Sequence, residues 1–124
     1  MEFKTRKIIK KLEENINNSY SLPIFKGYKA INKPGVEKLI DELYANLPDD
    51  VKKAREYLRD RQYNFNPGQK ENIFHTIQDI ENKLAEGYPL AQVVIINIRE
   101  LETLLNKLQN NLPEEITKAE ILDK

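Results

Sequence analysis

The chain has 124 residues and carries twenty basic and twenty acidic side chains, so its formal net charge is zero. A neutral chain has no overall electrostatic attraction to nucleic acid or to anionic lipid. The absence of cysteine excludes disulfides, thiolate catalysis and cysteine-ligated zinc. The longest apolar run, residues 93–96, is far shorter than the roughly 18 residues of a membrane span. We therefore expect a soluble, cytoplasmic protein.

The first half of the chain predicts three helices. Ile8, Ile9, Leu12 and Ile16 recur at helical spacing, which predicts an amphipathic helix over residues 3–18. A loop with a short extended segment within residues 24–31 follows. Asn32 is a good N-cap for a second helix. Pro48 is predicted to end that helix, because proline lacks an N–H and clashes with the preceding turn. A third helix would begin at Pro48, with Asp49 and Asp50 at its positive N-terminal end.

The second half predicts the same arrangement. A helical stripe from Ile73 to Leu84 is followed by Gly87 as a helix end, and β-branched residues 91–96 predict an extended segment. Asn97 is the N-cap of the next helix, and Pro113 with Glu114 and Glu115 begins the last. Residues 64–68 are a turn by composition and join the two halves.

The two halves resemble each other directly. Residues 31–54 and 96–119, which are 65 positions apart, are identical at ten of twenty-four positions, and residues 9–20 match residues 77–88 at a separation of 68. Each unit is too short to bury its apolar face well alone, so the units are expected to stack. The sequence thus predicts an all-α fold, in which tandem duplicated three-helix units form one helical bundle with short extended segments in the loops. Residues 1–124 would be a single domain with internal repeats 1–63 and 69–124.

The charges of the two halves differ. Residues 1–62 contain fourteen basic and ten acidic side chains, net +4, and residues 63–124 contain six and ten, net −4. Such a dipolar chain could favour head-to-tail contacts, or the duplicated surfaces could have diverged while solvated.

The loops contain the best candidates for a binding surface. Aromatic and β-branched residues there serve either as core or as partner contacts. An exposed edge at residues 93–96 would favour strand addition from another chain. The candidate partner-binding residues are Tyr20, Phe25, Tyr28, Tyr88, Val93, Val94 and Ile95.

Other candidates for chemistry are weaker. His75 is the only imidazole and has no evident partner. The adjacent carboxylates at 49–50 and 114–115 point about 100° apart on a helix and do not converge as a catalytic dyad. The basic residues near the N-terminus are interleaved with apolar ones at helical period, which indicates a solvated helix face. We therefore predict no catalytic, cofactor-binding or metal-binding residues, and no cofactor.

A stretch within residues 12–61 resembles the N-terminal head of DivIVA-like septation proteins and of the relatives labelled ATP-synthase-subunit-b-like. The similar parts are Leu22-Pro23, the helix from Val36, the segment Leu47-Pro48-Asp49-Asp50-Val51 and the ending Leu58-Arg59-Asp60-Arg61. The family's long coiled coil is absent here, and residues 73–122 stand in its place as a second copy of the head. The resemblance implies an interaction or scaffolding role around cell division or envelope growth, without known catalysis.

The sequence therefore predicts a non-enzymatic adaptor of a bacterial cytoplasm that binds another protein or itself. A monomer or a weak homodimer is expected, because two similar units can satisfy each other within one chain. The alternative is a small nucleic-acid-binding regulator that uses the basic N-terminal half.

Overall fold

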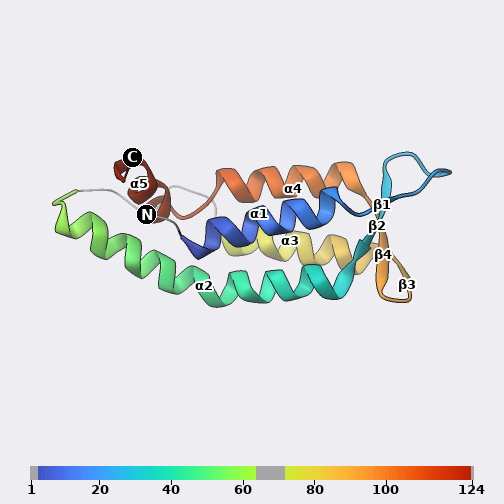
Figure 1. Ribbon diagram of the computed structural model, residues 1–124, viewed down its shortest axis with the longest axis horizontal. Coiled ribbons are helices and arrows are strands. Elements are labelled where there is room, and N and C mark those ends of the chain that lie inside the picture. Colours follow the sequence, from blue (N-terminus) through green and yellow to red (C-terminus); the bar gives the residue numbers. More distant parts are fainter. Residues whose placement is uncertain (1–2, 64–71, 124) are drawn as a thin grey trace.

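The computed structural model describes residues 3–63 and 72–123, so the predicted turn at residues 64–68 lies outside the described residues. The long helices lie side by side, with a small sheet at one end of the molecule and a short helix beside both termini at the other (Figure 1). The elements of the described chain are α1 (Lys4–Asn17), β1 (Tyr20–Ser21), β2 (Tyr28–Asn32), α2 (Lys33–Asp60), α3 (Ile73–Glu86), β3 (Tyr88–Leu90), β4 (Val93–Asn97), α4 (Ile98–Asn110) and α5 (Glu114–Leu122).

The predicted helix ends at Asn32, Gly87 and Asn97 are confirmed. The Asn32 side chain accepts a hydrogen bond from the Gly35 N–H at 3.4 Å, and the Asn97 side chain accepts one from the Arg99 N–H at 3.0 Å. Gly87 is the C-cap of α3. A Cβ at Gly87 would lie 2.4 Å from Val94 Cγ2, so only glycine allows α3 to end this close to β4.

The predicted break at Pro48 is wrong, because α2 continues through it to Asp60. Figure 1 shows α2 bending near its middle, where Pro48 lies. Proline inside a helix costs about 3 kcal/mol, and here that cost is outweighed by packing of the second half of α2. Ala54, Tyr57 and Leu58 are all buried there. The equivalent break at Pro113 does occur, since α5 begins immediately after it.

The all-α prediction is also wrong in part, because the described chain contains a four-stranded antiparallel sheet besides its five helices. The two predicted extended segments are present, but they are paired with each other. The strand order is β1-β2-β4-β3, so each half of the chain contributes one hairpin. Sequence alone did not predict this pairing because it joins segments far apart in the chain.

The central pair β2–β4 positions the sheet on the helices. Ile31 lies opposite Val94, and Lys29 opposite Ile96. Ile31, Val94 and Ile96 are buried, so this face of the sheet packs against the helical bundle. Opposite pairs in an antiparallel sheet share a face, and the alternate residues therefore face away from the bundle.

One hydrophobic cluster contains residues from both halves of the chain. The apolar stripes expected on the four long helices all contribute to it: Ile8, Ile9, Leu12 and Ile16; Leu39, Leu43 and Leu47; Ile77, Ile80 and Leu84; and Leu101, Leu104 and Leu108. Leu39 and Leu104 are only partly buried, and the remaining members are buried.

Two carboxylates, Asp50 and Glu115, are buried against neighbouring helices. Asp50 Oδ2 accepts hydrogen bonds from the backbone N–H of Thr5 at 2.7 Å and from its hydroxyl at 2.5 Å. Thr5 lies in the first turn of α1, whose own N-cap residue, Phe3, makes no side-chain cap. Asp50 of α2 therefore caps α1 from outside the helix. Glu115 instead pairs with Arg55 at 3.1 Å.

Replacing Asp50 should destabilise the protein more than replacing its neighbour. Asp50→Ala leaves the Thr5 N–H and hydroxyl buried without a partner, and we expect a loss of about 2 kcal/mol or more in unfolding free energy. Asp49→Ala removes an exposed carboxylate and should change it by less than about 0.5 kcal/mol. Urea denaturation followed by circular dichroism measures both. Equal effects would contradict the capping role.

Candidate functional site

The face of the sheet that points away from the helices carries a group of exposed apolar side chains. Its central row runs across all four strands, because Tyr20 pairs with Ala30, Ala30 with Ile95, and Ile95 with Tyr88. The residues of this outer face are Tyr20, Tyr28, Ala30, Asn32, Tyr88, Leu90, Val93, Ile95 and Asn97. We call this set the outer face.

The edge positions of the outer face are the most exposed. Tyr20 and Tyr88 are each 67% exposed, and Leu90 is 56% exposed. Ala30, Val93 and Ile95, on the two central strands, are half-buried beneath them. Large apolar side chains that cluster in this way on a sheet are typical of an interaction surface.

The loop between β1 and β2 adds further apolar side chains. Figure 1 shows this loop extending past the sheet, at the end of the molecule away from both termini. Ile24 is 84% exposed, Phe25 is 61% exposed, and Lys26 beside them is also exposed. We call these three residues the hairpin tip.

Backbone and ring contacts hold the hairpin tip in place. Gly27 has φ +83°, a conformation that favours glycine, and its carbonyl accepts a hydrogen bond from the Ile98 N–H at 2.8 Å. The rings of Phe25 and Tyr28 meet edge to face, with centroids 6.5 Å apart. The tip is therefore anchored both to the sheet and to the start of α4.

A hollow of about 260 Å³ opens beside the outer face, where α3 and α4 meet the sheet. Tyr28, Tyr88 and Ile95 line its apolar side, and Lys83, Glu86 and Glu100 line its charged side. We call it the tyrosine hollow. Lys83 Nζ lies 2.9 Å from Glu100 and 3.4 Å from Glu86. The hydrogen bond to Glu100, together with the charges of Glu100 and Glu86, raises the pKa of Lys83 above its usual value.

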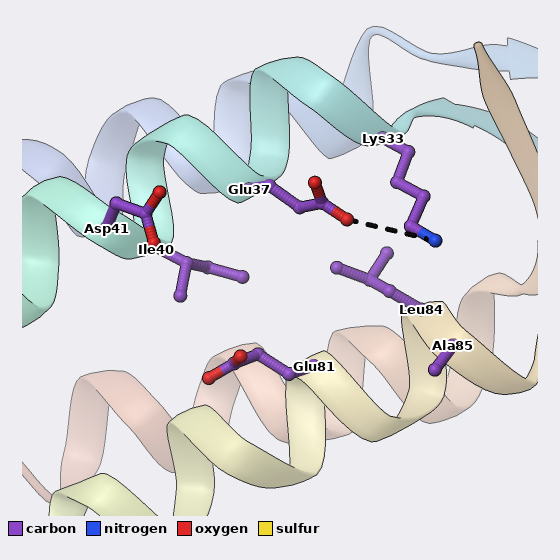
Figure 2. Close-up of a pocket in the computed structure, with 7 residues that line it drawn as sticks. All are labelled: Lys33, Glu37, Ile40, Asp41, Glu81, Leu84 and Ala85. Carbon is purple, nitrogen blue, oxygen red and sulfur yellow. Dashed lines mark ion pairs between the residues drawn. The ribbon is translucent and has the colours of Figure 1, made fainter.

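A second hollow, of about 220 Å³, lies between α2 and α3. Figure 2 shows its side chains: Glu37 and Ile40 project from α2, and Glu81 and Leu84 from α3, into the space between the helices. Lys33 lies 3.8 Å from Glu37, and Asp41 adds a third carboxylate. We call it the acidic hollow. It contains carboxylates and one ammonium but neither a histidine nor a hydroxyl nucleophile.

Tyr44 contacts one carboxylate of the acidic hollow, that of Glu81. Its hydroxyl donates a hydrogen bond to Glu81 at 2.6 Å, and its ring stacks on Phe74 with centroids 5.8 Å apart. Burial of the phenol, together with the hydrogen bond to Glu81 and the charge of Glu81, raises the pKa of Tyr44 to about 12.

The seven residues that the sequence predicted to bind a partner fall into two groups. Six of the seven, all but Val94, lie on the outer face or the hairpin tip. Val94 is 1% exposed and faces the helical core, because the pleat of β4 turns it inward. An exposed strand edge at residues 93–96 is also wrong, since β4 is paired on both sides. Whether the six outward residues bind a partner stays a prediction.

Sequence reasoning missed several residues of this surface. Ile24 and Leu90 are exposed beside predicted residues and could have been included as their apolar neighbours. Lys83, Glu86 and Glu100 carried no usable signal, because charged residues on predicted helices are normally solvated. Their grouping depends on α3 and α4 meeting at the sheet.

The remaining candidates do not form a reactive site. His75 lies on the exposed surface of α3. Among the described residues, no group of three or more histidine or carboxylate side chains is placed to hold a metal ion. Of the N-terminal basic residues, Arg6 pairs with Glu120 at 2.9 Å. None of the described helices has the length and apolar content needed to cross a bilayer.

Comparison with known proteins identifies no relative. No protein-family model matches the chain, and no curated protein and no solved structure matches it. Any assignment of function therefore depends on the residues and their geometry.

The phenol of Tyr44 should titrate at a higher pH than a free tyrosine, and the pH at its midpoint should depend on its contact with Glu81. Because folding raises its pKa from 10.0 to about 12, the folded state keeps a proton that the unfolded chain loses. The stabilisation from this phenol is thus complete below pH 10 and is lost as the pH rises toward 12. In an ultraviolet titration, the difference between the wild type and Tyr44→Phe should have a midpoint near 12.

Glu81→Gln removes the carboxylate and should lower that midpoint, while near-ultraviolet circular dichroism checks that the protein stays folded. A midpoint near pH 10 in the wild type would show that the contact is absent in solution.

Proposed function

We propose that this protein is a non-enzymatic protein-binding module, built from two tandem copies of one unit, that binds its partner through the outer face. The observation that carries the proposal is the row Tyr20–Ala30–Ile95–Tyr88, which presents two exposed tyrosines on either side of an aliphatic centre. Tyrosine is enriched in binding surfaces because it combines a large apolar area with a polar tip.

The outer face binds through its side chains rather than through its strand edges. The edge strand β1 has only two residues, and Pro89 lies in the middle of the other edge strand, β3. Proline has no N–H to donate to an added strand, and very short edges offer few backbone partners. Addition of a partner strand to an edge is therefore disfavoured, and the partner is expected to pack on the outer face itself.

The register of the sheet supports the tandem duplication. A twofold relation between two copies requires that the residue on the axis pairs with its own counterpart. A shift of 65 positions carries Ala30 to Ile95, and these two residues are partners in the β2–β4 ladder. The central pair of the outer face thus coincides with the axis that a duplication requires.

Equivalent side-chain contacts in the two halves support it further. Tyr44 donates to Glu81, and Gln109 donates to Glu13. The sequence shift of 65 carries Tyr44 to Gln109, and the shift of 68 carries Glu13 to Glu81. The same shift of 65 relates the two buried carboxylates, Asp50 and Glu115.

The cellular role that fits best is scaffolding in a bacterial cytoplasm. The resemblance to the heads of DivIVA-like proteins favours cell division or envelope growth as the process. Nucleic-acid binding is the weaker proposal, because Arg6 and Arg55 pair with the carboxylates of Glu120 and Glu115. Those pairs reduce the positive charge that a phosphate backbone would require.

Site-specific photo-crosslinking tests the outer face. With a photoreactive residue in place of Tyr88, protein added to an extract of its native cells should give a discrete protein adduct. The same residue in place of the exposed Glu56 on α2 is the matched control and should give none. Tyr20→Ala should reduce the adduct at position 88 about tenfold, because it truncates a large contact of the same face.

Adducts of equal yield at positions 88 and 56, or no loss with Tyr20→Ala, would refute the outer face as the binding site. The adduct mass also distinguishes a second copy of the chain from a different protein.

A further inference from the structure

The outer face carries a protrusion and a hollow next to each other. The hairpin tip (Ile24, Phe25, Lys26) extends past the sheet on the β1–β2 side (Figure 1). The tyrosine hollow opens on the β3–β4 side. Tyr28 connects the two, because it touches the Phe25 ring and also lines the hollow.

The protrusion and the hollow are complementary in character. The tip presents two exposed apolar side chains, and the hollow offers the apolar side chains of Tyr28, Tyr88 and Ile95. Lys26 brings a positive charge to the tip. The charged side of the hollow carries two carboxylates, Glu86 and Glu100, against the single ammonium of Lys83, so it is net negative.

We propose that the partner of the outer face is a second copy of this chain, bound about a twofold axis with the hairpin tip of each copy in the tyrosine hollow of the other. A twofold contact repeats each interaction, so both tips and both hollows are filled at once. The proposal rests on the proposed function and names the partner. The chain's net charge of zero adds no repulsion between copies.

The exposed area indicates a weak dimer. Six large apolar side chains of the outer face and tip are between 40% and 84% exposed. At roughly 100 Å² of exposed surface each, they supply about 600 Å² per copy. A standard stable interface buries about 800 Å² per partner, so we expect a dissociation constant in the micromolar range or weaker.

A membrane surface fits the same feature less well. Apolar residues beside a lysine would suit insertion among anionic lipids. Glu86 and Glu100, however, line the hollow beside the outer face and would be repelled by an anionic lipid surface. The hollow would also stay empty against a flat bilayer. A second copy, in contrast, uses both the hairpin tip and the tyrosine hollow.

Sedimentation equilibrium of the full chain from about 10 μM to about 1 mM tests the proposal. The wild type should change from monomer to dimer across this range. Phe25→Ala should weaken association at least about tenfold, because it removes the apolar anchor. Circular dichroism should be unchanged, since Phe25 is 61% exposed and lies outside the core.

Exchanging the charges of Lys26 and Glu86 tests whether the hairpin tip of one copy meets the tyrosine hollow of the other. Lys26→Glu and Glu86→Lys should each weaken association, because each places like charges at the contact between tip and hollow. An equal mixture of these two variants should associate more tightly than either alone, because every tip then meets a hollow of opposite charge. Glu56→Lys makes the same charge change on α2 and should leave association unaltered.

A monomer at 1 mM, or a dimer insensitive to Phe25→Ala and to the charge exchange, overturns the second copy as partner. Co-sedimentation of the monomer with phosphatidylglycerol vesicles that is lost with Phe25→Ala would assign the tip to membranes instead. If the protein does not self-associate but crosslinks at position 88 to another protein, this inference fails and the proposed function stands. If both experiments are negative, both proposals fail.

Discussion

The antiparallel pairing of β2 with β4 is the interaction on which the rest of the structure depends. Five residue pairs join the two halves of the chain through backbone hydrogen bonds. Because Ile31 and Val94 face inward from this ladder, they fix the sheet onto the core and leave the alternate residues outside. A slip of one residue in β4 would turn Ile95 toward the core and Val94 toward solvent, so every side chain of this strand would change face.

Charges between the halves reinforce this arrangement. The excess of basic residues in the first half and of acidic residues in the second is partly neutralised inside the fold. Arg6 pairs with Glu120, and Arg55 with the buried Glu115. Glu115 would be costly to bury alone, so its pairing with Arg55 ties α5 to α2. The charge asymmetry of the sequence therefore has a structural use within one chain, besides any role in association.

The parts that sequence predicted are those set by local chemistry. Asn32 and Asn97 begin helices because each side chain bonds its own helix N-terminus, and the periodic leucines and isoleucines of the helices form the core. The continuation of α2 through Pro48 was not predictable, since it depends on contacts with α1 and α5. The inward direction of Val94 was equally hidden: residues 93–96 are all apolar, so the sequence does not distinguish the two faces of the strand. The sequence identified most of the residues of the outer face. It could not show how they are arranged, because that arrangement depends on the pairing of the two hairpins.

The two hairpins differ in the length of their connections, and this difference gives one surface both a protrusion and a hollow. The connection between β1 and β2 spans residues 22–27, whereas β3 and β4 are joined by residues 91–92 alone. This tight turn places Ala91 at φ +56°, a strained conformation for a residue with a side chain, and keeps the second hairpin short. The shifts that align the halves place Lys83, Glu86 and Glu100 where the first half has Asn15, Asn18 and Gly35. The longer first loop thus provides the tip, and the shorter second hairpin with its charged helices provides the hollow. Two identical halves would present two tips or two hollows, and the proposed dimer depends on this difference between them, because each copy then offers one tip and one hollow.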